Sequence, residues 1–334
     1  MANETLSIGG EKTREYIKKY PNASTSSIAR KLAHDFPLLF TESSARALVR
    51  YHTNKLRSGK WRKCRNPIEK EGAHTRENPY GLAESDYEDQ SPFIIPPSVK
   101  DLLIGSDFHF LFQDNKAIST WIDYGIGQNP SGILLNGDVM DCYSVSAYDK
   151  NPNKGRIRDE FEAVRFFLKT LRNKFPNIPI YFKEGNHEER WERNLRVNAP
   201  VLLDMDEFKL DVILRLGEFG IEYIKDKRII KYSGLNIIHG HEIPFSSSAN
   251  GARSLWLKTG ESFLASHVHQ TTSNLFKKKG SGDVAGCWTI GCLCGLNPDY
   301  AKRSNNYMHG FAHVFKDGDY FSVKNFQMID YKVL

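Results

Sequence analysis

From about residue 99 to the C-terminus, short apolar runs alternate with amphipathic stretches. The runs at 102–106, 132–136 and 178–182 predict buried strands, and the stretch at 117–126 predicts a crossover helix. A further helix is predicted by an apolar stripe formed by Ile157, Phe161, Val164, Leu168 and Leu171. The C-terminal part has the pattern of β-structure, with a hairpin turn at Asp317-Gly318. This alternation is typical of an α/β domain.

The first 66 residues have a different pattern, in which apolar positions recur at helical spacing. We expect one helix over Glu11 to Lys19 and a second that begins after Ser24 or Thr25 and ends before Pro37. A third helix is expected from Thr41 to Gly59, and its outer face is basic, with Arg46, Arg50, Lys55 and Arg57. Three short helices with a basic last helix resemble a helix-turn-helix DNA-binding domain. The alternative is a helical bundle that docks a protein or has a merely solvated basic face.

Residues 67–98 are polar and contain turn-forming pairs such as Asn78-Pro79 and Pro96-Pro97, which predicts a linker. The expected organisation is therefore a basic helical domain at 1–66, a linker at 67–98 and an α/β domain at 99–334. No apolar run approaches the ~20 residues of a membrane span, and the first ten residues lack the pattern of a signal peptide. We expect a cytoplasmic protein without a membrane partner, and the sequence leaves its oligomeric state open.

The net charge of +6 is unevenly distributed along the chain. Residues 1–70 hold 15 basic and 6 acidic residues, a balance of +9, which leaves −3 for the remainder. A basic module joined to a mildly acidic body indicates that nucleic acid is a partner of the N-terminal domain. The cysteines lack the spacing of a zinc knuckle, so we interpret them as small buried residues in a reducing compartment.

Potential metal ligands follow the predicted strands directly. Five times, a short apolar run is followed at once by such residues, which are Asp107, His109, Asp138, Asn186, His239, His267 and His269. Because ligands bind at the carboxyl ends of strands in open α/β sheets, we expect these side chains to converge. Carboxylate, amide and imidazole donors in this number are too many for one tetrahedral zinc ion and suit two transition-metal ions, and no thiolate is offered.

Together, the blocks resemble the signature of calcineurin-like metallophosphoesterases: Asp107-x-His109, Gly137-Asp138-x-x-Asp141, Gly185-Asn186-His187-Glu188, His239 and His267-x-His269. The resemblance covers about residues 100–325, and the order and approximate separation of the five blocks match. It implies a four-layer α/β/β/α sandwich with a dinuclear site at the rim of the sheets. Walker-type, nucleophile-elbow and dinucleotide-binding motifs are absent from the sequence.

The resemblance also implies a role for each residue. One ion would be held by Asp107, His109 and His269, the other by Asn186, His239 and His267, and Asp138 would bridge them. Mn²⁺ is the first choice, with Fe or Zn as alternatives, and a hydroxide that bridges the ions would attack phosphorus. His187 would stabilise the phosphoryl group and protonate the leaving oxygen, and Asp141 would orient His187.

Some positions depart from the family pattern. Ser266 stands where the family has Gly before the last His-x-His, and we expect the tight turn to survive. Cys142-Tyr143 follows the second block in place of the Arg-Gly of Ser/Thr protein phosphatases, which argues against that branch. His241 and Arg190 are additional candidates for substrate binding; an ordinary contact for His241 and a solvated helix face for Arg190 are the alternatives.

These observations favour a metal-dependent phosphodiesterase or nuclease that acts on nucleic acid gripped by the N-terminal domain. The alternative is a phosphomonoesterase or protein phosphatase whose N-terminal helices dock a protein. A DNA-binding regulator with a vestigial phosphoesterase body is disfavoured, because the ligand set is complete.

Overall fold

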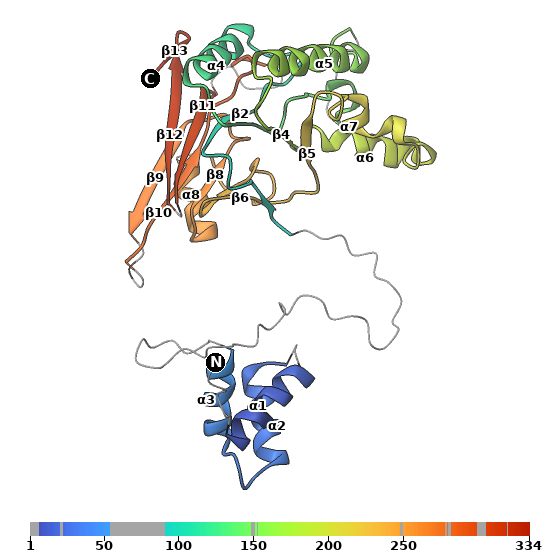
Figure 1. The fold of residues 1–334 in the computed structure, drawn as a ribbon. Coiled ribbons are helices and arrows are strands. Elements are labelled where there is room, and N and C mark those ends of the chain that lie inside the picture. Colours follow the sequence, from blue (N-terminus) through green and yellow to red (C-terminus); the bar gives the residue numbers. More distant parts are fainter. Residues whose placement is uncertain are drawn as a thin grey trace. The chain divides into compact units, whose positions relative to one another are not determined.

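The computed structural model of the chain describes residues 7–20, 23–53, 91–147, 151, 153–247, 250–277, 279, 282–298, 305–318 and 320–334 (Figure 1). They belong to two compact units, 1–87 and 88–334. Lys55, Arg57 and residues 67–90 of the expected linker lie outside the described residues. Within the described part of the chain, no helix is both long and apolar enough to cross a membrane.

The described part of the N-terminal unit forms the helices α1 (Ile8–Lys19), α2 (Thr25–Asp35) and α3 (Glu42–His52). The three helices begin after Ser7, Ser24 and Thr41 respectively. The side-chain hydroxyl of each of these residues accepts a hydrogen bond from a backbone N–H in the first turn of its helix. Apolar positions at helical spacing form the buried core, including Ile28, Leu32, Ala45 and Val49. Helices are found at all three expected places, and α1 begins earlier than Glu11 because Ser7 caps it. The expected extension of the third helix toward Gly59 is not confirmed, because α3 ends at His52 with Thr53 as its C-cap and residues 54–59 lie outside the described residues.

In the second unit, a seven-stranded sheet has the order β13-β12-β11-β2-β3-β4-β5. Its parallel half consists of β2 (Asp101–Gly105), β3 (Gly132–Asn136), β4 (Ile180–Lys183) and β5 (Ile221–Ile224). The antiparallel half consists of β11 (His309–Asp317), β12 (Tyr320–Ile329) and β13 (Lys332–Val333). The predicted strands after residue 99 and the hairpin at Asp317-Gly318 are therefore confirmed.

A second, six-stranded sheet has the order β1-β6-β7-β8-β10-β9. Its strands are β1 (Phe93–Ile94), β6 (Ile230–Tyr232), β7 (Leu235–Ile237), β8 (Phe263–Ala265), β9 (Thr272–Lys277) and β10 (Val284–Thr289). The assignment of residues 67–98 to a linker is wrong at its end, because Phe93–Ile94 pairs with β6. The ring of Phe93 packs edge-on against Tyr181, 5.7 Å between centroids, which anchors this short strand.

The layers follow from the buried side chains. Between the sheets, Leu102, Ile104 and Leu134 of one sheet share a core with Ile237 and Leu264 of the other. The opposite face of the seven-stranded sheet is covered by α4 (Asn115–Gln128) and α5 (Ile157–Lys174), and α8 (Gly251–Thr259) packs on the six-stranded sheet. Figure 1 shows α4 and α5 along one side of the sheets. The fold is thus the expected α/β/β/α sandwich.

The remaining elements lie in the connections between strands. They are α6 (Glu189–Asn198), α7 (Leu210–Ile213) and 3₁₀ turns at Tyr143–Val145, Pro200–Leu202 and Asp206–Phe208. Helix α6 begins directly after the third sequence block, and the turn at Tyr143–Val145 directly follows the second. Both therefore lie next to the carboxyl ends of the central strands.

Candidate metal centre

The candidate ligands lie in the turns that follow five strands. Asp107 and His109 follow β2, Asp138 follows β3, and Asn186 follows β4 in the seven-stranded sheet. In the six-stranded sheet, His239 follows β7, and His267 and His269 follow β8. Because the strands that carry them are parallel within each sheet, their carboxyl ends meet at one rim. Both sheets thus contribute to one group of side chains.

Most of these ligand positions have a left-handed backbone, with φ between 48° and 68° at Asp107, His109, Asp138, His267 and His269. Non-glycine residues seldom adopt this region, although Asp and His tolerate it better than branched residues. Such turns reverse the chain tightly and aim consecutive side chains toward one point. The bent backbone is held by hydrogen bonds between turns, since the N–H of His267 donates to Asp107 Oδ2 at 3.1 Å.

Asp138 has the central position in the group. Its Oδ2 lies 3.2 Å from His239 Nε2, 3.8 Å from His109 Nε2 and 3.7 Å from His187 Nε2. Its Oδ1 accepts the backbone N–H of His187 at 2.9 Å, which fixes the plane of the carboxylate. This one oxygen therefore faces histidines from three different turns. A carboxylate that is to bridge two cations needs such a central position.

Two clusters of donor atoms lie on either side of Asp138. In one, His269 Nε2 lies 3.1 Å from Asp107 Oδ1 and 3.4 Å from His109 Nε2. In the other, His239 Nε2 lies 3.2 Å from Asn186 Oδ1, and the ligand atoms of Asp138, His239 and His267 lie within 4.8 Å of one another. The seven candidate ligands therefore converge at one place, with donor atoms grouped on either side of Asp138.

His187 is held between Asp141 and Arg190. Its Nδ1 lies 2.9 Å from the backbone carbonyl oxygen of Asp141 and 3.0 Å from Asp141 Oδ1, so this nitrogen carries the proton. Its Nε2 lies 2.8 Å from Arg190 Nη2, and Arg190 Nη1 donates to the Asp141 carbonyl oxygen. Asp141 also lies 2.9 Å from His109 Nδ1, so one carboxylate serves two histidines.

The electrostatics of the group follow from burial and mutual attraction. Burial opposes the charge of Asp138, but His187 and His239 outweigh it and hold the pKa of Asp138 well below its usual range. For Asp107, burial again opposes the charge, but attraction to His269 outweighs burial and lowers the pKa of Asp107 to about 2. Burial and the neighbouring His239 lower the pKa of His267 to about 4, which keeps this imidazole available as a neutral ligand.

Comparison with known proteins identifies the family. The sequence profile of calcineurin-like phosphoesterases matches residues 102–291, which contain every one of the seven ligands. The chain belongs to the calcineurin-like phosphoesterase family. It is therefore a phosphoester hydrolase, and the family uses divalent metal ions.

Among curated relatives of this phosphoesterase, the Gene 54 protein of Mycobacterium phage L5 is 26% identical over 233 residues, which cover 66% of the present chain and 91% of the phage protein. Vacuolar Protein Sorting 29 of Cryptosporidium parvum matches with a TM-score of 0.40 and 12% identity, over 71% of this chain and 95% of that one. The phosphoesterase Yfce of E. coli matches with a TM-score of 0.32 and 13% identity, over 70% and 96% respectively.

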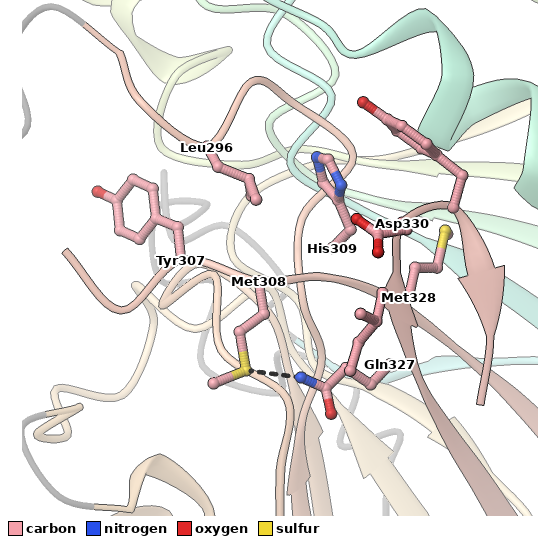
Figure 2. Close-up of a pocket in the computed structure, with 9 residues that line it drawn as sticks. Leu296, Tyr307, Met308, His309, Gln327, Met328 and Asp330 are labelled. Carbon is pink, nitrogen blue, oxygen red and sulfur yellow. Dashed lines mark hydrogen bonds between the residues drawn. The ribbon is translucent and has the colours of Figure 1, made fainter.

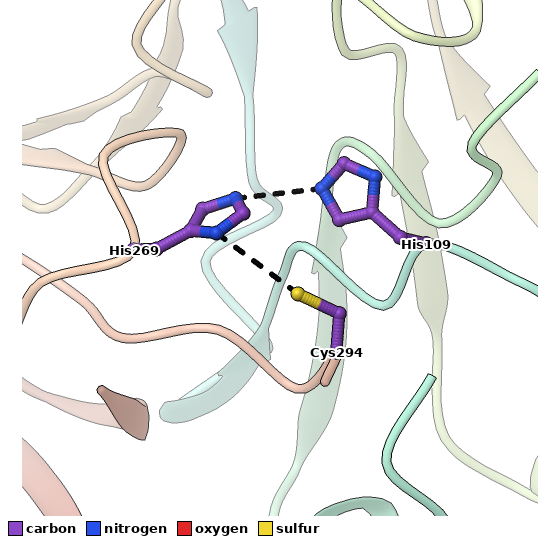
Figure 3. A group of neighbouring side chains, drawn as sticks. All are labelled: His109, His269 and Cys294. Atoms are coloured by element: carbon purple, nitrogen blue, oxygen red, sulfur yellow. Dashed lines mark hydrogen bonds between the residues drawn. The ribbon is translucent and has the colours of Figure 1, made fainter. Parts of the chain in front are cut away.

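The donor set fits two divalent ions. Nitrogen and carboxylate or amide oxygen donors in mixed coordination suit Mn²⁺, Fe or Zn. The sequence interpretation, which placed no sulfur here, was incomplete, because Cys294 Sγ lies 3.9 Å from His269 Nδ1 (Figure 3). The Sγ of Cys294 also lies within 4.8 Å of donor atoms of both His109 and His269, so the thiol lies among the candidate ligands of the first cluster. The expected burial of the cysteines is confirmed for Cys142, Cys287, Cys292 and Cys294.

Buried polar residues outside the ligand set hold the turns of this phosphoesterase, and the sequence analysis gave them no role. Glu188 accepts the backbone N–H groups of Asp138, Met140 and Gly185 at 2.8–2.9 Å, which joins the second and third blocks. Glu160 accepts the backbone N–H groups of Asp141 and Cys142, both at 2.6 Å. Glu160 could have been found, because it is an acidic residue on the apolar face of its helix.

Ser266 preserves the turn as expected. Its carbonyl oxygen accepts the N–H of Val268 at 2.7 Å, and its hydroxyl accepts a hydrogen bond from Asn136 Nδ2 at 2.6 Å. The hydroxyl thus makes a contact between the sheets that glycine would lack. Ser266 does not need the left-handed backbone that favours glycine, because His267 and His269 are the residues of this turn that adopt it.

The two candidate substrate residues lie in different surroundings. His241 Nε2 is 2.8 Å from Glu189 Oε1, so this histidine is partnered by the start of α6. Arg190 contacts His187 and is part of the centre, so the alternative of a purely solvated helix face is wrong for this residue.

A surface groove of about 300 Å³ lies beside the strands β11 and β12 (Figure 2). Its lining is mainly apolar and includes Leu296, Tyr307, Met308 and Met328. The ring of Tyr307 also lies 4.4 Å from that of His269, centroid to centroid, and the N–H of Met308 donates to the His269 carbonyl oxygen. Tyr307 and Met308 therefore contact the candidate ligand His269 and also line the groove.

Proposed function

We propose that this phosphoesterase is a metal-dependent phosphodiesterase or nuclease that acts on nucleic acid and uses two transition-metal ions, Mn²⁺ in first place. The observation that carries the dinuclear part is the placement of Asp138 Oδ2 between histidines of both donor clusters. The choice of nucleic acid is supported by the charge balance of +9 in residues 1–70 against −3 in the rest of the chain.

The ions would be held as the donor clusters suggest. Asp107, His109 and His269 would hold the first, Asp138 would be shared, and Asn186, His239 and His267 would hold the second. When bound, the ions would polarise the phosphoryl oxygens and lower the pKa of a bound water to about 7.

His187 is proposed as the general acid. Its Nδ1 proton is directed to Asp141, so Nε2 would give a proton to a leaving oxygen from the imidazolium form, in which Arg190 no longer donates to Nε2. Arg190 Nη2 lies at this same nitrogen, and its guanidinium is suited to grip a phosphoryl oxygen that approaches His187. The groove beside Tyr307 offers an aromatic and apolar surface for the organic group next to the phosphate.

The N-terminal helices are proposed to bind the nucleic-acid backbone. Arg46 and Arg50 lie four residues apart on α3 and so share one face of the helix; Arg50 is exposed, and Arg46 is half-buried and pairs with Glu42. A binding module joined to a hydrolase in one chain raises the substrate concentration at the centre.

A substrate panel with Mn²⁺ tests the proposal. We expect turnover of an aryl phosphodiester and of single- or double-stranded DNA or RNA to exceed turnover of an aryl phosphomonoester. The variant Arg46→Glu/Arg50→Glu should raise KM for the polynucleotide and leave the aryl diester unchanged. The matched control, Lys169→Glu/Lys174→Glu on exposed positions of α5, makes the same change in charge. Strong monoesterase activity without polynucleotide cleavage would overturn the choice of substrate.

A further inference from the structure

A buried ion pair joins the end of β4 to the loop that follows β7. Lys183, the last residue of β4, places its Nζ 2.8 Å from Glu242 Oε1, and the two side chains are 0% and 5% exposed. Lys183 Nζ also donates to the backbone carbonyl oxygen of Arg228 at 2.8 Å. Neither residue belongs to the five sequence blocks, and neither contacts the seven ligands through their donor atoms.

The two residues are placed symmetrically with respect to two ligands. Lys183 precedes Asn186 by three residues on the chain of the seven-stranded sheet, and Glu242 follows His239 by three on the chain of the six-stranded sheet. The same two loops meet again at the ligands themselves, where His239 Nε2 lies 3.2 Å from Asn186 Oδ1. The loops are therefore joined twice, by the contact between His239 and Asn186 and by the ion pair.

Glu242 also fixes the turn that carries His239. Its Oε1 accepts the N–H of His239 at 3.0 Å, and its Oε2 accepts the N–H of Gly240 at 2.7 Å. Gly240 has φ of 137°, and a Cβ there would lie 2.9 Å from the Cβ of His267, so the turn is packed against the neighbouring ligand turn. Both carboxylate oxygens thus hold the backbone of the turn that carries His239.

Energetics make a purely stabilising role a poor explanation. Taking both charges out of water costs several kcal/mol per ion, and an apolar pair of similar volume is often as stable or more stable. An apolar pair could not accept the two N–H groups or set the distance between the loops. The contacts of the pair therefore favour a role in the geometry of the two loops.

We propose that the Lys183–Glu242 ion pair is a positioning element that sets the spacing of Asn186 and His239 and thereby the affinity of the second ion, an inference that rests on the proposed two-ion site. Partners of metal ligands outside the coordination sphere commonly contribute 10–100-fold to metal affinity. We expect loss of the pair to weaken the second ion by about this factor and to leave the first ion in place.

The test is Mn²⁺ binding by the full chain, measured by calorimetric titration and by electron paramagnetic resonance. The wild type should bind two ions with a spin-coupled signal. Lys183→Met should bind one ion tightly and show the signal of isolated Mn²⁺. Because Lys183→Met leaves a buried carboxylate unpaired, the double variant Lys183→Met/Glu242→Gln, which removes both charges, keeps the test valid if the single variant does not fold.

The matched control is Glu184→Gln. Glu184 is the neighbour of Lys183 and is also buried, but it bonds to Tyr223 Oη at 2.7 Å and to the N–H of Asp226, away from the His239 turn. This variant should bind two ions as the wild type does. Unchanged two-ion binding in the folded double variant, or equal weakening of both ions, would overturn the inference alone. Failure of the wild type to bind two ions would overturn the proposed function and this inference with it.

Discussion

Replacement of Asp141 by asparagine separates two effects that one carboxylate produces. Asp141 Oδ1 lies 2.9 Å from Nδ1 of His109, a metal-ligand candidate, and 3.0 Å from Nδ1 of His187, the proposed general acid. In Asp141→Asn the remaining oxygen is neutral, and the amide nitrogen cannot accept a hydrogen bond. Both imidazoles therefore lose a charged partner, while the volume of the side chain is preserved.

The magnitude follows from the kind of bond that is lost. A hydrogen bond to a charged group contributes roughly 1.5–3 kcal/mol. With 1.36 kcal/mol per factor of ten, loss at His187 should lower kcat by roughly 10–150-fold at saturating Mn²⁺. Loss at His109 should raise the Mn²⁺ concentration for half-maximal activity by about 10–100-fold. The variant should therefore change both quantities.

The assay is kcat for an aryl phosphodiester over a range of Mn²⁺ concentrations. The matched control is Asp101→Asn, because Asp101 Oδ2 lies 2.8 Å from His313 Nε2 and makes the same kind of pair outside the centre. The control should leave both quantities near the wild-type values. An Asp141→Asn enzyme with unchanged kcat and unchanged metal dependence would refute the reasoning, and a fall in kcat alone would show that the contact with His109 is unimportant.

Three further changes test other parts of the centre. His187→Ala should retain two Mn²⁺ ions, measured by metal analysis, and lower kcat by about 10²–10⁴-fold; loss of metal would make His187 a ligand. Asp138→Asn should weaken both ions in a Mn²⁺ titration, and two full ions would show that the bridge is wrongly assigned. Burial raises the pKa of Glu160 from 4.5 to about 8. Between these two pH values the carboxyl is ionised in the unfolded chain but protonated in the folded one, so Glu160 lowers the free energy of unfolding more and more as the pH rises. Relative to the wild type, Glu160→Gln should therefore gain thermal stability between pH 5 and pH 8, by at most roughly 5 kcal/mol, and an equal difference at both pH values would contradict the burial argument.

The sequence predicted the parts of the fold that depend on local hydrophobic pattern. The strands β2, β3 and β4 are nearly continuous apolar runs because both faces of their sheet are covered, and such runs are visible without a structure. The strand β1 was missed because Phe93–Ile94 is too short to show a period and lies near prolines. Its pairing with β6, more than 130 residues away, is a tertiary contact that no local pattern contains.

The positions of the candidate ligands were predictable for a related reason. Each lies within four residues of the end of a strand, so the position of a strand end also limits where a candidate ligand can be. Asn136, Glu160 and Lys183 were not assigned roles, since a polar residue near a strand or on a helix does not reveal which distant N–H or carbonyl group it meets. For example, the side chain of Asn136 donates to the carbonyl oxygen of Ile238, 102 residues away.

The strained ligand turns and the buried carboxylates explain one another. A left-handed residue other than glycine costs on the order of 1–3 kcal/mol and persists only where its surroundings determine it. Asp138 has φ of 51°, and its N–H is bound by Glu188, which also binds the N–H of Gly185 in the next loop. Gly185 has no room for a side chain, because a Cβ would lie 2.3 Å from Asp138 Oδ1. The carboxylate that is proposed to bridge the ions is therefore positioned by backbone contacts that extend across two loops, and these contacts depend on the carboxylate of Glu188 and on the absence of a side chain at Gly185.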